Sequence, residues 1–257
     1  MRKTYLVIIG LLAVMFWTGA AQASTSIVTG GFNEDEVLAA PSGSITRAVD
    51  ANYAAWAENG YMASNGTVTA GLPVSGSFIS ATGDGITYRF QPYIADNALR
   101  MGNGDPSFGT MMVVPGKYST LYILDTSGST FGVLSSNITL NFASGPSSTY
   151  ASALFAPDWY HTYTSSQVAL GGLQRIVLSN NSINGDGAID FQLYESVLNL
   201  TSADLGRTLV SVTFNNVAGS GATSVYDIEV VPLPPTVLLL GSGLLGLGGL
   251  RFWRKRS

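Results

Sequence analysis

The sequence predicts an all-β protein, a β-sandwich or jelly roll with one or two short helices. Short runs rich in Val, Ile, Leu, Thr, Phe and Tyr recur from about residue 70 to residue 230. Clusters of Gly, Asn, Asp, Ser and Pro separate these runs, as turns separate the strands of a sandwich. The segment 24–230, about 200 residues long, also has an ordinary length for one such domain. We therefore treat it as a single domain.

Eight segments have the composition of strands, because β-branched and aromatic residues are concentrated in them. They are residues 86–91, 110–114, 120–124, 138–142, 174–178, 188–194, 209–215 and 225–230. Turns are predicted where glycine stands beside Asn, Asp, Ser or Pro, since these residues adopt the backbone angles of tight turns. The predicted turns are Gly83-Asp84-Gly85, Gly102-Asn103-Gly104, Thr126-Ser127-Gly128, Ser144-Gly145-Pro146 and Asn184-Gly185-Asp186-Gly187.

Two segments favour short helices. In residues 46–58, Val49, Tyr53 and Trp56 recur at the i, i+4, i+7 spacing that places them on one helix face. We expect that face to be buried and Trp56 to lie in the core. A second short helix is predicted after residue 199, where hydroxyl side chains offer an N-cap.

The distribution of charge excludes one broad class of function. The segment 24–230 carries 6 basic and 16 acidic residues, a formal net charge of −10, and the other basic residues lie at the two ends of the chain. Binding to a nucleic-acid backbone needs clustered Lys and Arg, so no nucleic-acid partner is expected. The chain has no Cys, which also excludes thiolate catalysis and Cys-based zinc sites.

The N-terminus has the three parts of a bacterial export signal. Arg2 and Lys3 form a positive region, residues 5–17 form an apolar region, and Ala21-Gln22-Ala23 supplies a small-x-small cleavage site. We expect residues 1–23 to be a signal peptide that is removed after Ala23. The alternative is a retained membrane anchor, although 13 apolar residues are short for a membrane span of about 20.

The C-terminus also has three parts. Val231-Pro232-Leu233-Pro234-Pro235 is an extended segment, because proline cannot continue a helix. The uncharged run 236–250 follows and predicts a hydrophobic transmembrane helix. Basic residues after an apolar run are held on the cytoplasmic side and stop translocation. Here those residues are Arg251, Arg254, Lys255 and Arg256.

This ending resembles the PEP-CTERM sorting signals of Gram-negative bacteria, in their Val-Pro-Leu-Pro variant. The resemblance covers 231–257, and the motif of that family maps onto Val231, Pro232, Leu233 and Pro234. The family usually has a small residue after the motif, whereas this chain has Pro235. The resemblance implies recognition by an exosortase, a transient inner-membrane precursor, and then a place at the cell surface or in an exopolysaccharide matrix. The alternative is a simple tail anchor.

The domain itself is similar to the galactose-binding-like jelly rolls that accompany glycosidases and PEP-CTERM proteins. This resemblance implies a sandwich fold and a carbohydrate ligand, and it has no diagnostic motif. It rests on the order of Gly71-Leu72-Pro73-Val74-Ser75-Gly76, Gln91-Pro92-Tyr93, Asp96-Asn97-Ala98-Leu99-Arg100, Tyr118-Ser119-Thr120-Leu121-Tyr122, Ala156-Pro157-Asp158-Trp159 and Leu193-Tyr194-Glu195.

No combination of residues predicts an enzyme. A serine hydrolase would have to use His161, the one histidine, and the chain has no Gly-x-Ser-x-Gly elbow. A glycosidase needs two carboxylates at a set distance, and nothing in the spacing of the acidic residues pairs them. The acidic residues that a glycosidase could use are Asp158, Asp186, Asp190 and Glu195. We therefore expect no catalytic residue, and a glycoside hydrolase remains only an alternative.

Calcium is the one metal that the sequence leaves open. Asp186 and Asp190 alternate with other oxygen donors in a Gly- and Asn-containing loop, as ligands do in calcium loops. The downstream Glu of an EF-hand is missing, and Asn-Gly and Asp-Gly pairs are also the preferred hairpin turns. We therefore expect a plain turn and no cofactor, with calcium as the alternative.

Asp158, Trp159 and Tyr160 are the candidate glycan contacts. Aromatic rings can stack on sugar rings, and the carboxylate can accept hydrogen bonds from hydroxyl groups. The alternative, which tryptophan burial in general favours, is that Trp159 fills the core while Asp158 caps a turn.

From the sequence we expect an exported surface or matrix protein with a binding or structural role. Extracellular polysaccharide is the expected partner besides the exosortase-like enzyme. A glycan-binding module predicts an exposed aromatic platform, whereas a structural matrix protein without a small ligand predicts aromatic residues that are buried throughout.

Overall fold

The computed structural model describes residues 24–50, 53–129, 135–160, 167–185, 191–216 and 221–231. Segment Ser24–Val230 forms one compact unit. The predicted signal peptide, the Pro motif after Val231, the run 236–250 and the basic end lie outside the described residues, as do His161, Asp186 and Asp190. Within the part that the structure describes, no helix is long and apolar enough to cross a membrane.

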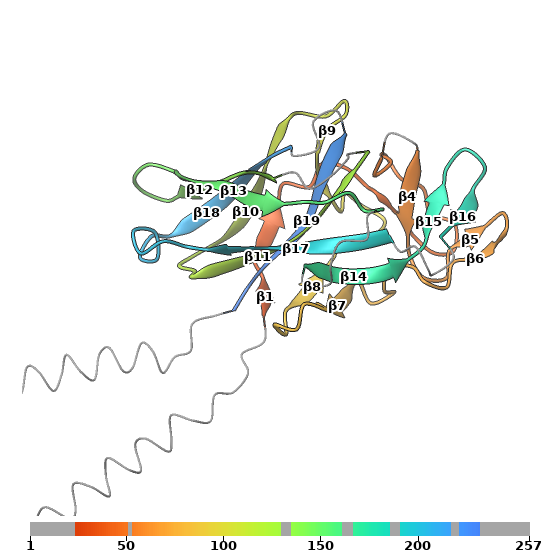
Figure 1. The fold of residues 1–257 in the computed structure, drawn as a ribbon, viewed down its shortest axis with the longest axis horizontal. Coiled ribbons are helices and arrows are strands. Elements are labelled where there is room, and N and C mark those ends of the chain that lie inside the picture. Colours follow the sequence, from red (N-terminus) through yellow and green to blue (C-terminus); the bar gives the residue numbers. More distant parts are fainter. Residues whose placement is uncertain are drawn as a thin grey trace, which may run out of the picture. The chain divides into compact units, whose positions relative to one another are not determined.

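The chain is all-β, and its antiparallel sheets are consistent with a β-sandwich or jelly roll (Figure 1). One large sheet has β11 in the middle of its order, and β9 (Leu99–Gly102) lies off this order and pairs with β19. The order of its other strands is β1 (Thr25–Ser26), β19 (Ala222–Val230), β11 (Thr120–Gly128), β17 (Phe191–Asn199) and β14 (Val168–Leu173).

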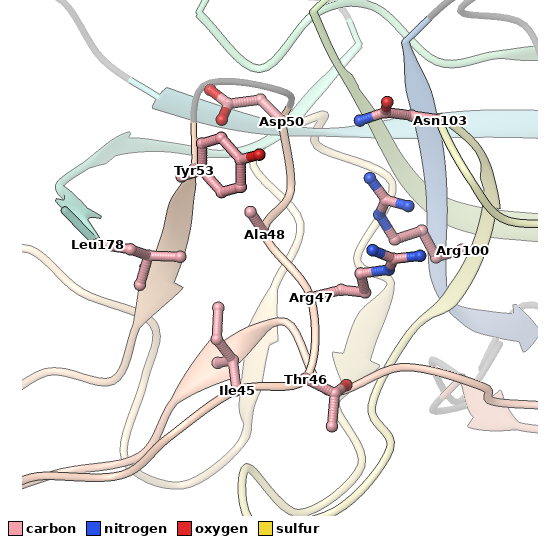
Figure 2. A pocket seen from close by; sticks show the side chains of 9 residues that line it. All are labelled: Ile45, Thr46, Arg47, Ala48, Asp50, Tyr53, Arg100, Asn103 and Leu178. Carbon is pink, nitrogen blue, oxygen red and sulfur yellow. The ribbon is translucent and has the colours of Figure 1, made fainter.

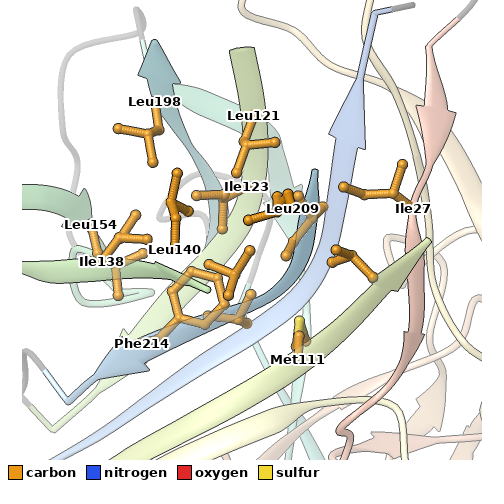
Figure 3. Packing of buried hydrophobic residues seen from close by; sticks show 14 of the residues in the cluster. Ile27, Met111, Leu121, Ile123, Ile138, Leu140, Leu154, Leu198, Leu209 and Phe214 are labelled. Atoms are coloured by element: carbon orange, nitrogen blue, oxygen red, sulfur yellow. The ribbon is translucent and has the colours of Figure 1, made fainter. Parts of the chain in front are cut away.

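A second antiparallel sheet packs against the first. Its order is β13 (Ser148–Phe155), β12 (Ser135–Phe142), β18 (Leu209–Asn215), β10 (Phe108–Gly116) and β2 (Val28–Gly30). Inward-facing residues of both sheets form the main core, including Leu121, Ile123, Ile138, Leu140 and Phe214 (Figure 3). In β12 buried positions alternate with partly exposed ones, which is the pattern of a strand with one face in the core.

Short strands form a third layer. One small sheet has the order β16 (Ser182–Asn184), β15 (Arg175–Val177), β4 (Ala54–Ala57) and β3 (Val37–Leu38), and β3 runs parallel to β4. The pairs β5 (Met62–Ala63) with β6 (Gly66–Thr67), and β7 (Ser77–Ile79) with β8 (Thr87–Arg89), make separate ribbons.

A second core contains residues of this third layer and of the large sheet, among them Trp56, Tyr88, Leu124 and Tyr226. The large sheet is therefore covered on both faces. This explains why every residue of β19 is buried, polar residues included, because a strand between two packed layers has no solvent face.

Each of the eight predicted strands overlaps a strand of the structure. Strands that the composition does not reveal are short or have unusual residues. For example, β13 is rich in Ser and Ala, and β14 contains Gly171 and Gly172. Strand propensity is weak where packing against neighbours decides the conformation.

The predicted turn at Thr126-Ser127-Gly128 is wrong, because β11 continues through Gly128 and pairs there with Ala222. Glycine is needed at this position for another reason. A Cβ atom on Gly128 would collide with the carbonyl oxygen of Val49, so the glycine permits a close approach of two chain segments.

The predicted helix over 46–58 is also wrong. Ala54–Ala57 form β4, and the N–H of Tyr53 donates to the carbonyl of Asp50 at 3.4 Å. Tyr53 is 70% exposed, so the three residues at helical spacing do not share a buried face. Trp56 lies in the core as predicted, but it does so from a strand that is buried on both faces.

The second predicted helix, after residue 199, is a series of turns. Asp204 N–H donates to the carbonyl of Thr201 at 2.9 Å, and Arg207 N–H donates to the carbonyl of Asp204 at 2.9 Å. The side chain of Asp204 accepts hydrogen bonds from Ser148 and Tyr150 of β13, and these contacts hold the segment against the sheet instead of letting it continue as a helix.

Candidate functional site

The predicted glycan contact at Trp159 is wrong, because only 1% of this residue is exposed. Its ring meets that of Trp56 edge-on, with centroids 4.8 Å apart, and also contacts Phe191. Asp158 Oδ1 accepts the backbone N–H of Tyr160 at 2.9 Å. This is the core tryptophan and turn-capping aspartate that the sequence offered as the alternative.

Tyr160 remains at the surface, but its ring already has protein neighbours. It packs on Phe191 with centroids 5.5 Å apart, and the Arg175 guanidinium lies 5.9 Å from its centroid. Arg175 also pairs with Asp50 at 3.0 Å. The cation occupies the aromatic surface that a sugar ring would need.

A pocket of about 290 Å³ lies close by and shares Asp50 with this cluster (Figure 2). Three parts of the chain build it: the segment that enters β4, the strand β9 with the residue that follows it, and the residue after β15. Its lining residues are Ile45, Thr46, Arg47, Ala48, Asp50, Tyr53, Arg100, Asn103 and Leu178. This volume lies at the lower end of the range of small-ligand sites.

Two lining residues of this pocket have left-handed backbone angles. Tyr53 has φ of 60° and Asn103 has φ of 49°. Asparagine tolerates this conformation, whereas it is rare for a bulky residue such as tyrosine. The carbonyl of Tyr53 accepts the N–H of Leu178 at 2.8 Å, which ties the turn to the end of β15. The strained turn thus holds a largely exposed aromatic ring at the pocket.

The polar groups of the pocket differ in how firmly they are held. Asp50 accepts the N–H of Ala54 through Oδ1 at 3.1 Å and Arg175 through Oδ2 at 3.0 Å. The Arg47 side chain is 43% exposed, and its nearest carboxylate oxygens, on Glu34 and Asp105, are 3.8 and 3.7 Å away. Arg47 is therefore the lining cation that can turn toward a ligand at little cost.

Arg100 forms a rigid wall of the pocket. It is buried, it pairs with Asp105, and its Nε lies 3.1 Å from Glu36 Oε1. Glu36 also accepts Ser224 at 2.9 Å and Tyr226 at 2.8 Å. Burial raises the pKa of Glu36 to about 7, although the Arg100 charge opposes this shift.

A second pocket, of about 350 Å³, is more apolar and lies between the β3–β4 region, the segment before β7 and the loop after β8. Val74 and Ile94 are exposed beside it, and Glu58 Oε2 accepts the N–H of Ala40 at 2.7 Å. Among the described residues, neither of the two pockets is lined by a pair of carboxylates. A glycosidase site therefore gains no support from them.

The remaining candidate residues are not gathered into a site. Glu195 is buried beneath Thr82 and Tyr88, whose hydroxyls bond its carboxyl at 3.1 and 2.9 Å. Burial raises the pKa of Glu195 to about 7. The described residues contain no cluster of acidic or histidine side chains that could hold a metal ion. The calcium candidates Asp186 and Asp190 fall outside that part of the chain.

Sequence reasoning missed Arg47, Asp50 and Tyr53, because it placed them on a helix. The signal available was the turn Gly102-Asn103-Gly104, which brings Asn103 to the same pocket. Nothing in the sequence indicated that this turn and the segment before β4 meet.

No protein-family model matches the chain, and no curated protein matches it significantly.

Proposed function

We propose that the chain is an exported protein of the bacterial cell surface or extracellular matrix, processed at both ends. In this proposal a signal peptidase cuts after Ala23, and an exosortase-like enzyme processes the tail beyond the Val231-Pro232-Leu233-Pro234 motif. The features that support it are the export signal and the PEP-CTERM-like ending of the sequence.

One structural observation carries this proposal. The first strand after the predicted signal peptide pairs with the last strand before the predicted tag, with Thr25 opposite Val230 and Ser26 opposite Glu229. The two ends of the domain are therefore neighbours on one sheet. Neighbouring ends suit a precursor whose two terminal segments enter the same membrane, because neither connection has to cross the length of the domain.

The test is made on the surface form from the native host. N-terminal sequencing should begin at Ser24, and the intact mass should lack the residues after about 234 or 235. A mass that includes the basic end Arg251–Ser257 would leave a tail anchor in place of a sorting tag. An exported protein whose N-terminal sequence begins at Met1 would show that the predicted signal peptide is not cleaved.

We further propose that the pocket at Tyr53 binds a hydroxyl-rich glycan. An exposed aromatic ring can stack on a sugar ring, and Arg47, Asp50 and Asn103 offer donors and acceptors for hydroxyl groups within the same pocket. The resemblance of the domain to galactose-binding-like jelly rolls points to the same ligand class. The buried Trp56 and Trp159 support the alternative, a structural matrix protein without a small ligand.

Glycan-array binding of the detergent-purified full chain separates these two functions. Tyr53→Asn removes the ring but suits the left-handed φ, so the fold should be kept. We expect it to weaken binding at least about tenfold, or ~1.4 kcal/mol. The matched control Tyr160→Ala removes an exposed ring outside the pocket and should leave binding unchanged. No binding by the wild-type chain would favour the structural role, and a loss only in the control variant would return the site to Tyr160.

A further inference from the structure

Two carboxyl side chains share one buried face of β19. A register shift at Tyr226 places Leu124 opposite Asp227 and Asp125 opposite Val225. Asp227 and Glu229 lie two residues apart on β19 and therefore share one face of the sheet. Their contacts with Arg89 show that this is the face on which β8 lies, and Ser26 of the neighbouring strand β1 also reaches Asp227. Both residues are at most 1% exposed.

The charges on this face do not balance. Asp227 accepts hydrogen bonds from Ser26 Oγ at 2.6 Å and from the backbone N–H groups of Ile228 and Arg89 at 2.8 Å each. Glu229 Oε1 pairs with Arg89 at 2.7 Å. Glu229 Oε2 is buried and has no hydrogen bond of good geometry with the described residues, and the groups close to the Glu229 carboxyl are the Ser24 hydroxyl and the Asp227 carboxyl. Two carboxyls thus face one guanidinium, and the Arg89 side chain is itself 47% exposed.

Among the described residues, the other groups that face Glu229 supply no further cation. Tyr122 of β11 lies directly opposite it, and Ser24 and Ser26 approach from the segment containing β1. Burial, followed by the charge of Asp227, raises the pKa of Glu229 to about 8. Burial also raises the pKa of Asp227 to about 6. Asp227 and Glu229 therefore keep one proton between them near neutral pH, and this proton offsets the charge that a second cation would otherwise have to balance.

Ser24 stands at the edge of this site. It is buried, and its hydroxyl accepts the N–H of Thr87 at 2.8 Å. The same hydroxyl lies against the Glu229 carboxyl and lowers its pKa. The backbone nitrogen of Ser24 is three covalent bonds from this oxygen, so the two atoms lie within about 4 Å of each other.

We propose that Asp227 and Glu229 form a binding site for the α-ammonium group that cleavage after Ala23 creates on Ser24. Hydrolysis adds water across the Ala23–Ser24 amide, leaving a carboxylate on Ala23 and an amine on Ser24 that takes up a proton. A free α-amino group has a pKa of about 7.7–8.0, and two neighbouring carboxylates raise it further. This inference rests on the proposed export cleavage and gives that cleavage a second role, because removing the signal peptide completes an ion pair that stabilises the released domain.

The test uses the full chain in detergent, with residues 20–23 replaced by the recognition sequence of a site-specific protease that cuts directly before Ser24. The melting temperature of one preparation is measured before and after cutting, at pH 7.5 and at pH 5. Cutting should raise it by about 2–6 °C at pH 7.5, a shift typical of one buried interaction in a chain of this size. The gain should shrink to less than about 1 °C at pH 5, where the carboxyl pair of the uncut chain already holds its protons.

Three controls isolate the position of the ammonium group. In a second chain, the cut leaves one extra Ala before Ser24. This chain loses the same leader, but its ammonium group lies about 3.3 Å from the position that it has on Ser24. Cutting this chain should therefore not raise its melting temperature. Glu229→Gln should abolish the gain. Asp96→Asn, which neutralises an exposed carboxylate, should keep it.

An equal gain in the displaced chain, or no gain at pH 7.5, would overturn the proposal, and neither result depends on how Glu229→Gln folds. An NMR titration provides a direct reading: the Ser24 amine should titrate above about 8, and a value at or below the ordinary range would contradict the site. Because an added protease sets the N-terminus, failure here leaves the export proposal intact. That proposal fails instead on N-terminal sequencing in the native host.

Discussion

Trp56 shows how a single residue connects the layers of this domain. Its ring is fully buried and packs edge-on against Trp159. Its Nε1–H donates to the hydroxyl of Tyr226 at 3.0 Å, and that hydroxyl in turn donates to Glu36. One side chain therefore joins β4 to β19 and to the buried contact between Glu36 and Arg100.

Trp56→Ala should lower the free energy of unfolding by about 3–5 kcal/mol, because it leaves a large cavity and removes the indole N–H that donates to the Tyr226 hydroxyl. Urea denaturation of the full chain in detergent measures the change. Ile94→Ala is the control, since Ile94 is 84% exposed and its loss should cost less than about 0.5 kcal/mol. A cost below about 1 kcal/mol for Trp56→Ala would contradict the central place of this residue.

At the scale of elements, β19 differs from the small ribbons of the third layer. It pairs with β1, β9 and β11, and it is covered on both faces. The ribbon of β5 and β6 has exposed residues and only two strands. An isolated two-stranded ribbon has little stability of its own, so the parts of the domain should open with different free energies.

Hydrogen exchange should follow this difference. We expect the amides of β11 and β19 to exchange most slowly, through global unfolding, and the amides of β5 and β6 to exchange at least about 100-fold faster, through local opening. Peptide-resolved exchange followed by mass spectrometry measures both rates in one sample. Equal protection of the two regions would mean that the third layer unfolds together with the sandwich.

Several carboxyl groups are buried in the part of the chain that the structure describes. Glu36, Asp125 and Glu195 are all at most 3% exposed, and burial raises the pKa of each, to about 7 for Glu36 and Glu195. Asp204 differs from these three carboxyls. Burial raises its pKa, but hydrogen bonds from Tyr150, Arg207 and Ser148 lower it further, so its pKa lies below the ordinary value.

Stability should therefore fall as pH rises from about 5 to 8. The folded state keeps protons on Glu36 and Glu195 that the unfolded chain loses near pH 4, so the stabilisation is complete below about pH 4 and lost as pH passes about 7. The effect is on the order of 3 kcal/mol for Glu36 alone. Urea denaturation at pH 5, 6.5 and 8 measures it.

Two variants separate the source of this pH dependence. Glu36→Gln keeps a neutral side chain of the same shape and should flatten the profile, whereas Asp96→Asn should leave it unchanged because Asp96 is exposed. A wild-type stability that is constant or rises between pH 5 and 8 would show that these carboxyls are ionised in the folded chain.

Local composition was enough to locate the longer strands. Residues 209–215, for example, are rich in β-branched and aromatic side chains, which favour a strand in most surroundings. Local composition was not enough for β4, whose residues Ala54–Ala57 have no strong strand preference and are held by pairing with β3 and β15. The candidate pocket could not be predicted for the same reason. Arg47 and Tyr53 meet Arg100 and Asn103 only because β9 pairs with β19 and thereby returns the chain to the segment before β4.

The sequence by itself determined the fold class and the acidic charge, since both depend on local composition. It also predicts an export signal before the domain and a sorting-type tail after it, and both stay predictions. Tertiary structure decided which residues are buried and which meet. It placed Trp159 in the core, left Tyr53 exposed, and set Ser24 beside Glu229. Such contacts join positions as far apart as residues 24 and 229, and only the pairing of β1 with β19 specifies them.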